Sequence, residues 1–170
     1  MRLVAALGVV ALLLTGCVTA TNKLPLEQIA DLRIGEVSVS FADGAQVAPD
    51  LRSVVGPKLK SAMERELTPR LKGSNPVRVE VHVRSITVAS DAQRILVGGH
   101  HGMTADVTLV DLRTKSVLVT YPEQSVFAPA GQGVGGALLD RALLADPVDR
   151  ISANFAFKYG EWLRPSESRT

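Results

Sequence analysis

The chain has few of the residues on which catalysis and disulfide bonding depend. Cys17 is its single cysteine, so no disulfide can form within it, and its 170 residues include only three histidines. The G-x-S-x-G signature of serine hydrolases and the H-E-x-x-H signature of zinc proteases are both absent. These absences predict a protein that is not an enzyme. A hydrolase that uses two carboxylates is the alternative, because carboxylates far apart in a sequence can meet in a fold.

Excess charge and long apolar runs are also missing. The 19 lysines and arginines nearly balance the 17 aspartates and glutamates and form no basic stripe, so we expect no nucleic-acid partner. Leu3 to Leu14 is an apolar run without charge, but it is shorter than the roughly 20 residues that a membrane-spanning helix needs. Aromatic residues make up only 4% of the chain, which permits small voids in the core without requiring a cavity.

The first 16 residues have the pattern of a signal peptide. Arg2 and the free amine supply the positive charge, Leu3 to Leu14 supplies the apolar segment, and the small residues Thr15 and Gly16 follow. An ordinary secretory signal that ends near a cysteine, or a buried helix, is the alternative interpretation.

Leu14-Thr15-Gly16-Cys17 resembles the lipobox of bacterial lipoproteins. The resemblance implies that residues 1–16 are cleaved and that Cys17 becomes the acylated, palmitate-bearing first residue, which leaves 154 of the 170 residues. Several acyl chains anchor a protein stably, whereas one does so only marginally. Inner-membrane lipoproteins usually have aspartate after the cysteine, and here that residue is Val18. The resemblance therefore implies an outer-membrane location with the domain facing the periplasm. An inner-membrane location is the alternative.

The rest of the sequence indicates one periplasmic domain. Residues 17–30 are expected to form the lipid anchor and a tether, because residues 18–26 show no apolar period and include a proline. Residues 31–164 are long enough for a single domain, and residues 165–170 form a polar tail.

Apolar periodicities predict a first strand and a first helix. The strand covers residues 32–41, with an irregularity near Gly35, and a turn at Asp43-Gly44 closes it. Asp50 is the expected N-cap of the helix, whose apolar residues recur every four positions as far as residue 67. Because proline disrupts a helix, the regular part is expected to begin near Pro57.

Three more strands and a final helix complete the predicted fold. Alternating apolar residues place the strands at 77–83, 103–109 and 117–121, with a hairpin at 111–115. The helix begins near residue 136 and breaks at Asp146-Pro147, which is a typical N-cap followed by proline. The order β-α-β-β-β-α predicts an α+β two-layer sandwich, with a mostly antiparallel four-stranded sheet and helices on one face.

Residues 77–121 resemble a group of small bacterial lipoproteins filed as domains of unknown function. The shared pattern is an arginine and glycines before a strand that ends in Asp-x-x-Thr, and here it is Arg94, Gly98, Gly99, Gly102 and Asp111-Leu112-Arg113-Thr114. Lys115 stands where the family usually has glycine. The element order also resembles the N-terminal domain of the periplasmic Tol-system propeller protein and the outer-membrane lipoproteins that activate peptidoglycan synthases. These resemblances imply an envelope interaction module and supply no catalytic residues.

Two motifs suggest a cofactor but fail on closer inspection. His100 and His101 lack the three or four ligands of a zinc site and would point to opposite sides of an extended backbone, so a solvated loop is expected. His82 alternates with charged residues on the wet face of a strand. Residues 131–136 match G-x-G-x-x-G, but the strand required after the helix is missing, so a flexible linker is expected. We therefore predict no metal, no nucleotide and no other cofactor.

The segment from Gln124 to Leu139 contains no charged residue and is the candidate partner-binding surface. Its candidate contact residues are Phe127, Val134 and Leu138. The alternative is that the segment covers the sheet edge. The polar sheet face is a second candidate surface, for which ordinary solvation is the alternative.

These features predict a non-catalytic lipoprotein, held to the membrane by its N-terminal lipid, that binds another envelope protein. A carrier or chaperone for a lipid or other hydrophobic ligand is the alternative function.

Overall fold

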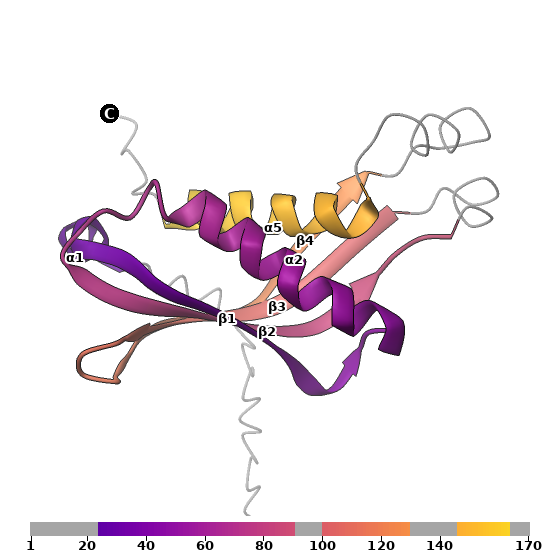
Figure 1. The fold of residues 1–170 in the computed structure, drawn as a ribbon, viewed down its shortest axis with the longest axis horizontal. Coiled ribbons are helices and arrows are strands. Elements are labelled where there is room, and N and C mark those ends of the chain that lie inside the picture. The colour runs from indigo at the N-terminus through magenta and orange to yellow at the C-terminus, as the bar shows by residue number, and fades with distance from the viewer. Residues whose placement is uncertain (1–23, 91–99, 130–145, 164–170) are drawn as a thin grey trace, which may run out of the picture.

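The computed structural model describes residues 24–90, 100–129 and 146–163, which form a four-stranded sheet with two long helices on one face (Figure 1). The elements are α1 (Leu26–Asp31), β1 (Leu32–Gln46), α2 (Pro49–Leu67), β2 (Asn75–Thr87), β3 (His100–Asp111), β4 (Val117–Pro129) and α5 (Pro147–Trp162). The strand order is β1-β2-β3-β4. β1 pairs with β2 in parallel, and the other two pairings are antiparallel. The predicted α+β sandwich with a mostly antiparallel sheet is confirmed.

Alternation along the central strands decides which face the helices cover. Val77, Val79, Val81 and Val83 of β2 are fully buried, while the side chains between them lie on the opposite face. β3 continues this buried layer with Met103, Ala105, Val107 and Leu109. Because α2 and α5 both lie over this apolar layer, the other face of the sheet is left uncovered in the described part of the chain (Figure 1).

Helix α2 is buried along the predicted stripe but begins earlier than predicted. Residues 55, 59, 63 and 67 are fully buried. The helix begins at Pro49 with Ala48 as N-cap, so the predictions of Asp50 as N-cap and of a regular start near Pro57 were wrong. Pro57 lies inside the helix on its exposed side, as does Ser53 four residues before it. Water can therefore reach the Ser53 carbonyl that proline leaves without a helical donor.

Helix α5 begins where the sequence predicted. The Asp146 carboxylate accepts a 2.8 Å hydrogen bond from the N–H of Val148, and Pro147 occupies the first turn, so the N-cap is confirmed. Phe155 and Tyr159 are fully buried under the helix. The ring of Tyr159 meets that of Tyr121 edge to face at 5.7 Å, which joins α5 to β4.

Strand β1 is longer than predicted. The irregularity at Gly35 is confirmed as a register shift, and a Cβ at this position would lie 2.6 Å from a side-chain carbon of Leu112. Asp43-Gly44 does not end the strand, which continues to Gln46 across a second register shift. Gly44 has a φ of 73°, a conformation that glycine adopts without strain, so the chain bends there without leaving the sheet.

Two further segments differ from the sequence prediction. Residues 26–30, placed in the tether by sequence, belong to helix α1, whose Ile29 packs into the core. β4 continues past the predicted end at residue 121 as far as Pro129. The predicted signal peptide, most of the predicted tether, the predicted helical segment 136–145 and the predicted polar tail lie outside the described residues.

The β3–β4 turn holds the Asp-x-x-Thr motif. One carboxylate oxygen of Asp111 accepts hydrogen bonds from the N–H groups of Arg113 at 2.7 Å and Thr114 at 3.0 Å. The other oxygen accepts one from the amide of Asn75 at 3.0 Å. The hydrogen bonds from Thr114 and Asn75 lower the pKa of Asp111 to about 2. The motif is therefore a structural clamp between this turn and β2.

Candidate interaction surfaces

The uncovered face of the sheet carries polar side chains that pair with one another across neighbouring strands. Ser40 Oγ and His82 Nδ1 are hydrogen-bonded at 2.8 Å. Arg84 Nε donates to Asp106 at 2.8 Å, and this contact raises the pKa of Arg84. Hydroxyl pairs join Thr104 to Ser125 and Thr108 to Thr120. These pairs join neighbouring strands across the uncovered face, and each contributes modestly to the stability of the sheet.

The most exposed large apolar side chain of the described residues lies on this face. Phe127 of β4 is 65% exposed and lies opposite Gly102 of β3. A Cβ at Gly102 would lie 3.2 Å from the Phe127 ring, so the ring rests on the bare glycine backbone. The ring of His100 meets it edge to face at 5.3 Å. The Phe127 site, as we name these three residues, thus holds an exposed aromatic ring in a fixed position.

The structure tests only part of the predicted binding segment. Phe127 does not lie in a loop, because residues 124–129 form the end of β4. Val126 and Ala128 on either side of it are buried, as expected in a strand. Because all three residues are apolar, the sequence carries no period-two signal at this point. Cys17, Val134 and Leu138 lie outside the described residues, as does the G-x-G-x-x-G segment.

The adjacent histidines lie in β3 and not in a solvated loop, so that prediction was wrong for His101. His101 is fully buried, and its Nδ1 accepts a 3.1 Å hydrogen bond from the N–H of Ala89. His100 is exposed on the other face, as expected for adjacent residues of an extended strand. Over residues 24–90, 100–129 and 146–163, no group of three metal-ligating side chains comes together.

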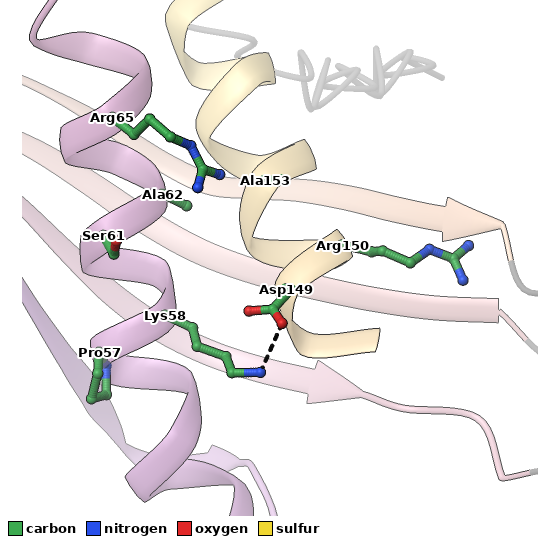
Figure 2. A pocket seen from close by; sticks show the side chains of 8 residues that line it. All are labelled: Pro57, Lys58, Ser61, Ala62, Arg65, Asp149, Arg150 and Ala153. Carbon is green, nitrogen blue, oxygen red and sulfur yellow. Dashed lines mark hydrogen bonds and ion pairs between the residues drawn. The ribbon is translucent and has the colours of Figure 1, made fainter. Parts of the chain in front are cut away.

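The helical face has an open groove of about 550 Å3 between α2 and α5 (Figure 2). Its lining residues are Pro57, Lys58, Ser61, Ala62, Arg65, Asp149, Arg150 and Ala153. Lys58 and Arg65 reach from α2 towards α5, whereas Arg150 extends away from α2 (Figure 2). Charged side chains and openness to solvent distinguish this groove from the dry pocket that a lipid carrier needs.

An ion pair closes one end of the groove. Lys58 Nζ lies 3.0 Å from Asp149 and 3.2 Å from Asp146, and the hydrogen bond to Asp149 raises the pKa of Lys58. These contacts fix the first turn of α5 against α2. This ion pair was not predicted from the sequence, although Asp146 and Asp149 near the N-terminus of α5 are a signal that favours a nearby cation.

No helix in the described part of the chain is long and apolar enough to cross a membrane.

Comparison with known proteins reveals similarity in fold only. No protein-family model matches the chain, and no curated protein sequence matches it. Among solved structures, the PelC dodecamer from Paraburkholderia phytofirmans has a TM-score of 0.50 and 12% sequence identity, over 80% of this chain and 90% of that one.

Two other solved structures come from bacterial proteins. A candidate lipoprotein from Caulobacter crescentus CB15 is 17% identical over 75% of this chain and 86% of its own, with a TM-score of 0.39. Protein XCC0632 from Xanthomonas campestris, of the DUF330 family, is 11% identical over 76% of this chain and 82% of its own, with a TM-score of 0.46. The chain therefore shares its α+β fold with a bacterial protein whose solved structure is a dodecamer.

Proposed function

We propose that this protein is a lipid-anchored, non-catalytic interaction module of the bacterial cell envelope, and that it binds a partner protein at the Phe127 site. The single observation that carries the partner contact is the 65% exposure of the Phe127 ring among the hydrogen-bonded polar side chains of the uncovered face. Aromatic side chains, phenylalanine included, are enriched in the cores of protein interfaces. A rigid ring also loses little conformational entropy on binding, because Gly102 and His100 already hold it.

The lipid anchor is supported by the sequence around Cys17, where a short apolar run and two small residues precede the cysteine. The uncovered polar face and the helical groove lack a converging nucleophile, base and acid among the described residues, which is why we favour binding over catalysis. Ser40 and His82 are hydrogen-bonded, but both are exposed on a flat face that offers no cleft for a substrate.

The anchor is tested by the intact mass of the protein extracted from its own membranes in mild detergent. We expect loss of residues 1–16 and a mass increase from acyl groups on Cys17. The Cys17→Ala variant should instead retain residues 1–16. An extracted protein that lacks residues 1–16 and carries an unmodified Cys17 would contradict the anchor.

The partner contact is tested by native mass spectrometry of the same preparation. We expect a protein companion that is lost in Phe127→Ser and retained in Phe157→Ser. Phe157 is a matched control, because it is 53% exposed but lies on α5, away from the sheet face. Equal loss in both variants would argue against the Phe127 site. A bound lipid in place of a protein would support the carrier function.

The PelC protein from Paraburkholderia phytofirmans, which has a similar fold, forms a dodecamer. Twelve copies of this chain in the native mass spectrum would make a second copy the partner, and the same pair of variants would then report on that contact.

A further inference from the structure

Four exposed cationic side chains gather at one end of the domain. Arg33 is the second residue of β1, Lys72 lies between α2 and β2, and Arg113 and Lys115 lie in the β3–β4 turn. Figure 1 shows α1, the α2–β2 connection and the β3–β4 turn at the same end of the sheet. We call these four residues the basic end.

Backbone contacts bring the four residues together from separate parts of the sequence. Arg33 and Lys72 form an antiparallel bridge. The N–H of Leu112 donates to the carbonyl of Pro76 at 3.0 Å, which holds the β3–β4 turn against the start of β2. Arg113 is close enough to Asp31, the last residue of α1, for their charges to interact. The basic end is thus a surface of the folded domain and not a run of basic sequence.

The four cations form no close ion pairs with the described residues, and they outnumber the nearby carboxylates. None of the four cations forms an ion pair within 4 Å with another described residue. Two nearby carboxylates offset part of this charge: Asp31 accepts a 2.7 Å hydrogen bond from the hydroxyl of Ser74, and Asp111 lies buried beneath its turn. Hydrogen bonds lower the pKa of both groups, so both are negatively charged. Glu27 of α1 is a third carboxylate and is exposed, as is Asp31, so the four cations exceed these carboxylates by one.

We propose that the basic end binds the anionic lipid headgroups of the membrane to which the chain is tethered. This inference rests on the proposed lipid anchor. Residues 17–23 can extend to at most about 25 Å, so a lipid on Cys17 keeps the domain close to the bilayer surface. Each lysine or arginine near an anionic surface strengthens binding by about fivefold. The basic end is therefore a second attachment that adds to the acyl chains.

Binding at the basic end also sets the orientation of the Phe127 site. β4 starts at Val117, beside the basic end, and reaches Phe127 ten residues later, a distance of about 33 Å along an extended strand. With the basic end on the headgroups, Phe127 is held at the opposite end of the sheet, directed away from the bilayer and accessible to a protein partner.

The test is sedimentation of the mature chain with vesicles, using a Cys17→Ser form without lipid. We expect binding to vesicles that contain phosphatidylglycerol, little binding to pure phosphatidylcholine, and release as the salt concentration rises. Lys72→Gln/Arg113→Gln/Lys115→Gln should weaken binding by about tenfold or more. The matched control Lys60→Gln/Arg65→Gln/Lys158→Gln removes the same charge from α2 and α5 and should change binding by no more than about twofold.

Equal binding to neutral and anionic vesicles, or equal weakening in the two triple variants, would overturn the proposal. Circular dichroism of both triple variants verifies that they are folded. The vesicle assay uses no lipidated protein, so the two proposals can fail independently. An unmodified Cys17 in the extracted protein would contradict the lipid anchor. An absence of vesicle binding would contradict headgroup binding by the basic end.

Orientation is measured on the lipidated protein with a fluorophore on the Ser116→Cys variant or on the Ser61→Cys variant. Ser116 borders the basic end, whereas Ser61 lines the groove between the helices. Brominated lipids should quench the probe at position 116 more strongly, and equal quenching at the two positions would contradict the proposed orientation.

Discussion

The N–H of Lys115 donates a 2.8 Å hydrogen bond to the carbonyl oxygen of Asp111, and this bond holds Lys115 in the left-handed region with a φ of 62°. The position is the one at which the resembling lipoproteins usually have glycine. A side chain with a Cβ pays a steric penalty in this conformation, whereas glycine does not. Lys115 therefore adopts a backbone conformation that glycine would adopt without strain.

Replacing Lys115 with glycine is expected to stabilise the domain. Lys115→Gly removes the steric penalty at this turn and should raise the free energy of unfolding by about 0.5–1 kcal/mol. The control Lys158→Gly, in the exposed side of α5, should lower it by about 1 kcal/mol. Urea denaturation followed by circular dichroism measures both. A destabilising Lys115→Gly would indicate that the lysine side chain stabilises the turn by a contact of its own.

Asp111 is expected to make the stability depend on acid pH. Its pKa is about 2 in the folded protein because of hydrogen bonds from Thr114 and Asn75, and 3.8 in the absence of these contacts. The carboxylate thus stabilises the fold above about pH 4, and this contribution is lost as the pH falls towards 2. Asp111→Asn should have a lower melting temperature at pH 6 and a smaller further decrease between pH 4 and pH 2.

A matched control for this pH dependence is Asp43→Asn, because Asp43 is exposed in the bend of β1. The melting temperature of this variant should decrease between pH 4 and pH 2 as much as that of the wild-type protein. Identical pH profiles for all three proteins would exclude Asp111 as the source.

Asp146 is expected to stabilise α5 in two separable ways. Its side chain caps the helix at the N–H of Val148 and also contacts Lys58. Asp146→Ala removes both contacts and should lower the free energy of unfolding by about 1–1.5 kcal/mol. Asp146→Asn keeps a capping oxygen and loses the charge, so it should lower that energy by about 0.5 kcal/mol or less. Urea denaturation would contradict this division if the two variants were equally destabilised.

Gly102 and Phe127 are expected to be energetically coupled. In the unmodified protein, Gly102→Ala brings a methyl group to 3.2 Å from the Phe127 ring, which must then move. In a Phe127→Ala background this conflict is absent, and Gly102→Ala should stabilise the strand by about 0.5–1 kcal/mol, because glycine is unfavourable within a strand. A double-mutant cycle measures the coupling, and additive effects would show that the ring does not rest on Gly102.

Strong local periodicity made most of the architecture predictable. Valines occupy four alternate positions of β2, and apolar residues occupy every fourth position of α2. These patterns determine which face of each element is buried. The α5 N-cap was also predictable, because aspartate followed by proline both accepts the first N–H and fixes the first φ.

The errors occurred where a local rule was overridden by the surroundings. Pro57 does not end α2, because the carbonyl that it leaves unbonded lies on the exposed side of the helix. β4 continues past Pro122 because Glu123 adopts a φ of 50°, which absorbs the irregularity within the strand. Neither the exposed side of a helix nor the φ of a single residue can be recognised from residue type alone.

The Phe127 site and the basic end were predictable to different extents. Phe127 was identified by sequence because its segment lacks charge, but its pairing with Gly102 depends on strand register. The basic end combines residues from strand β1 and from two connections of the chain, so no local run of charge reveals it.

The irregularities in the two edge strands have a consequence for crowding. β1 is interrupted by register shifts after Ile34 and Phe41, and β4 contains Pro122 followed by the left-handed Glu123. Neither edge therefore offers a long, regular row of amide and carbonyl groups to which another sheet could add. A molecule confined to two dimensions meets its copies far more often than one in bulk solution, and these interruptions would keep such collisions from becoming permanent β-aggregates.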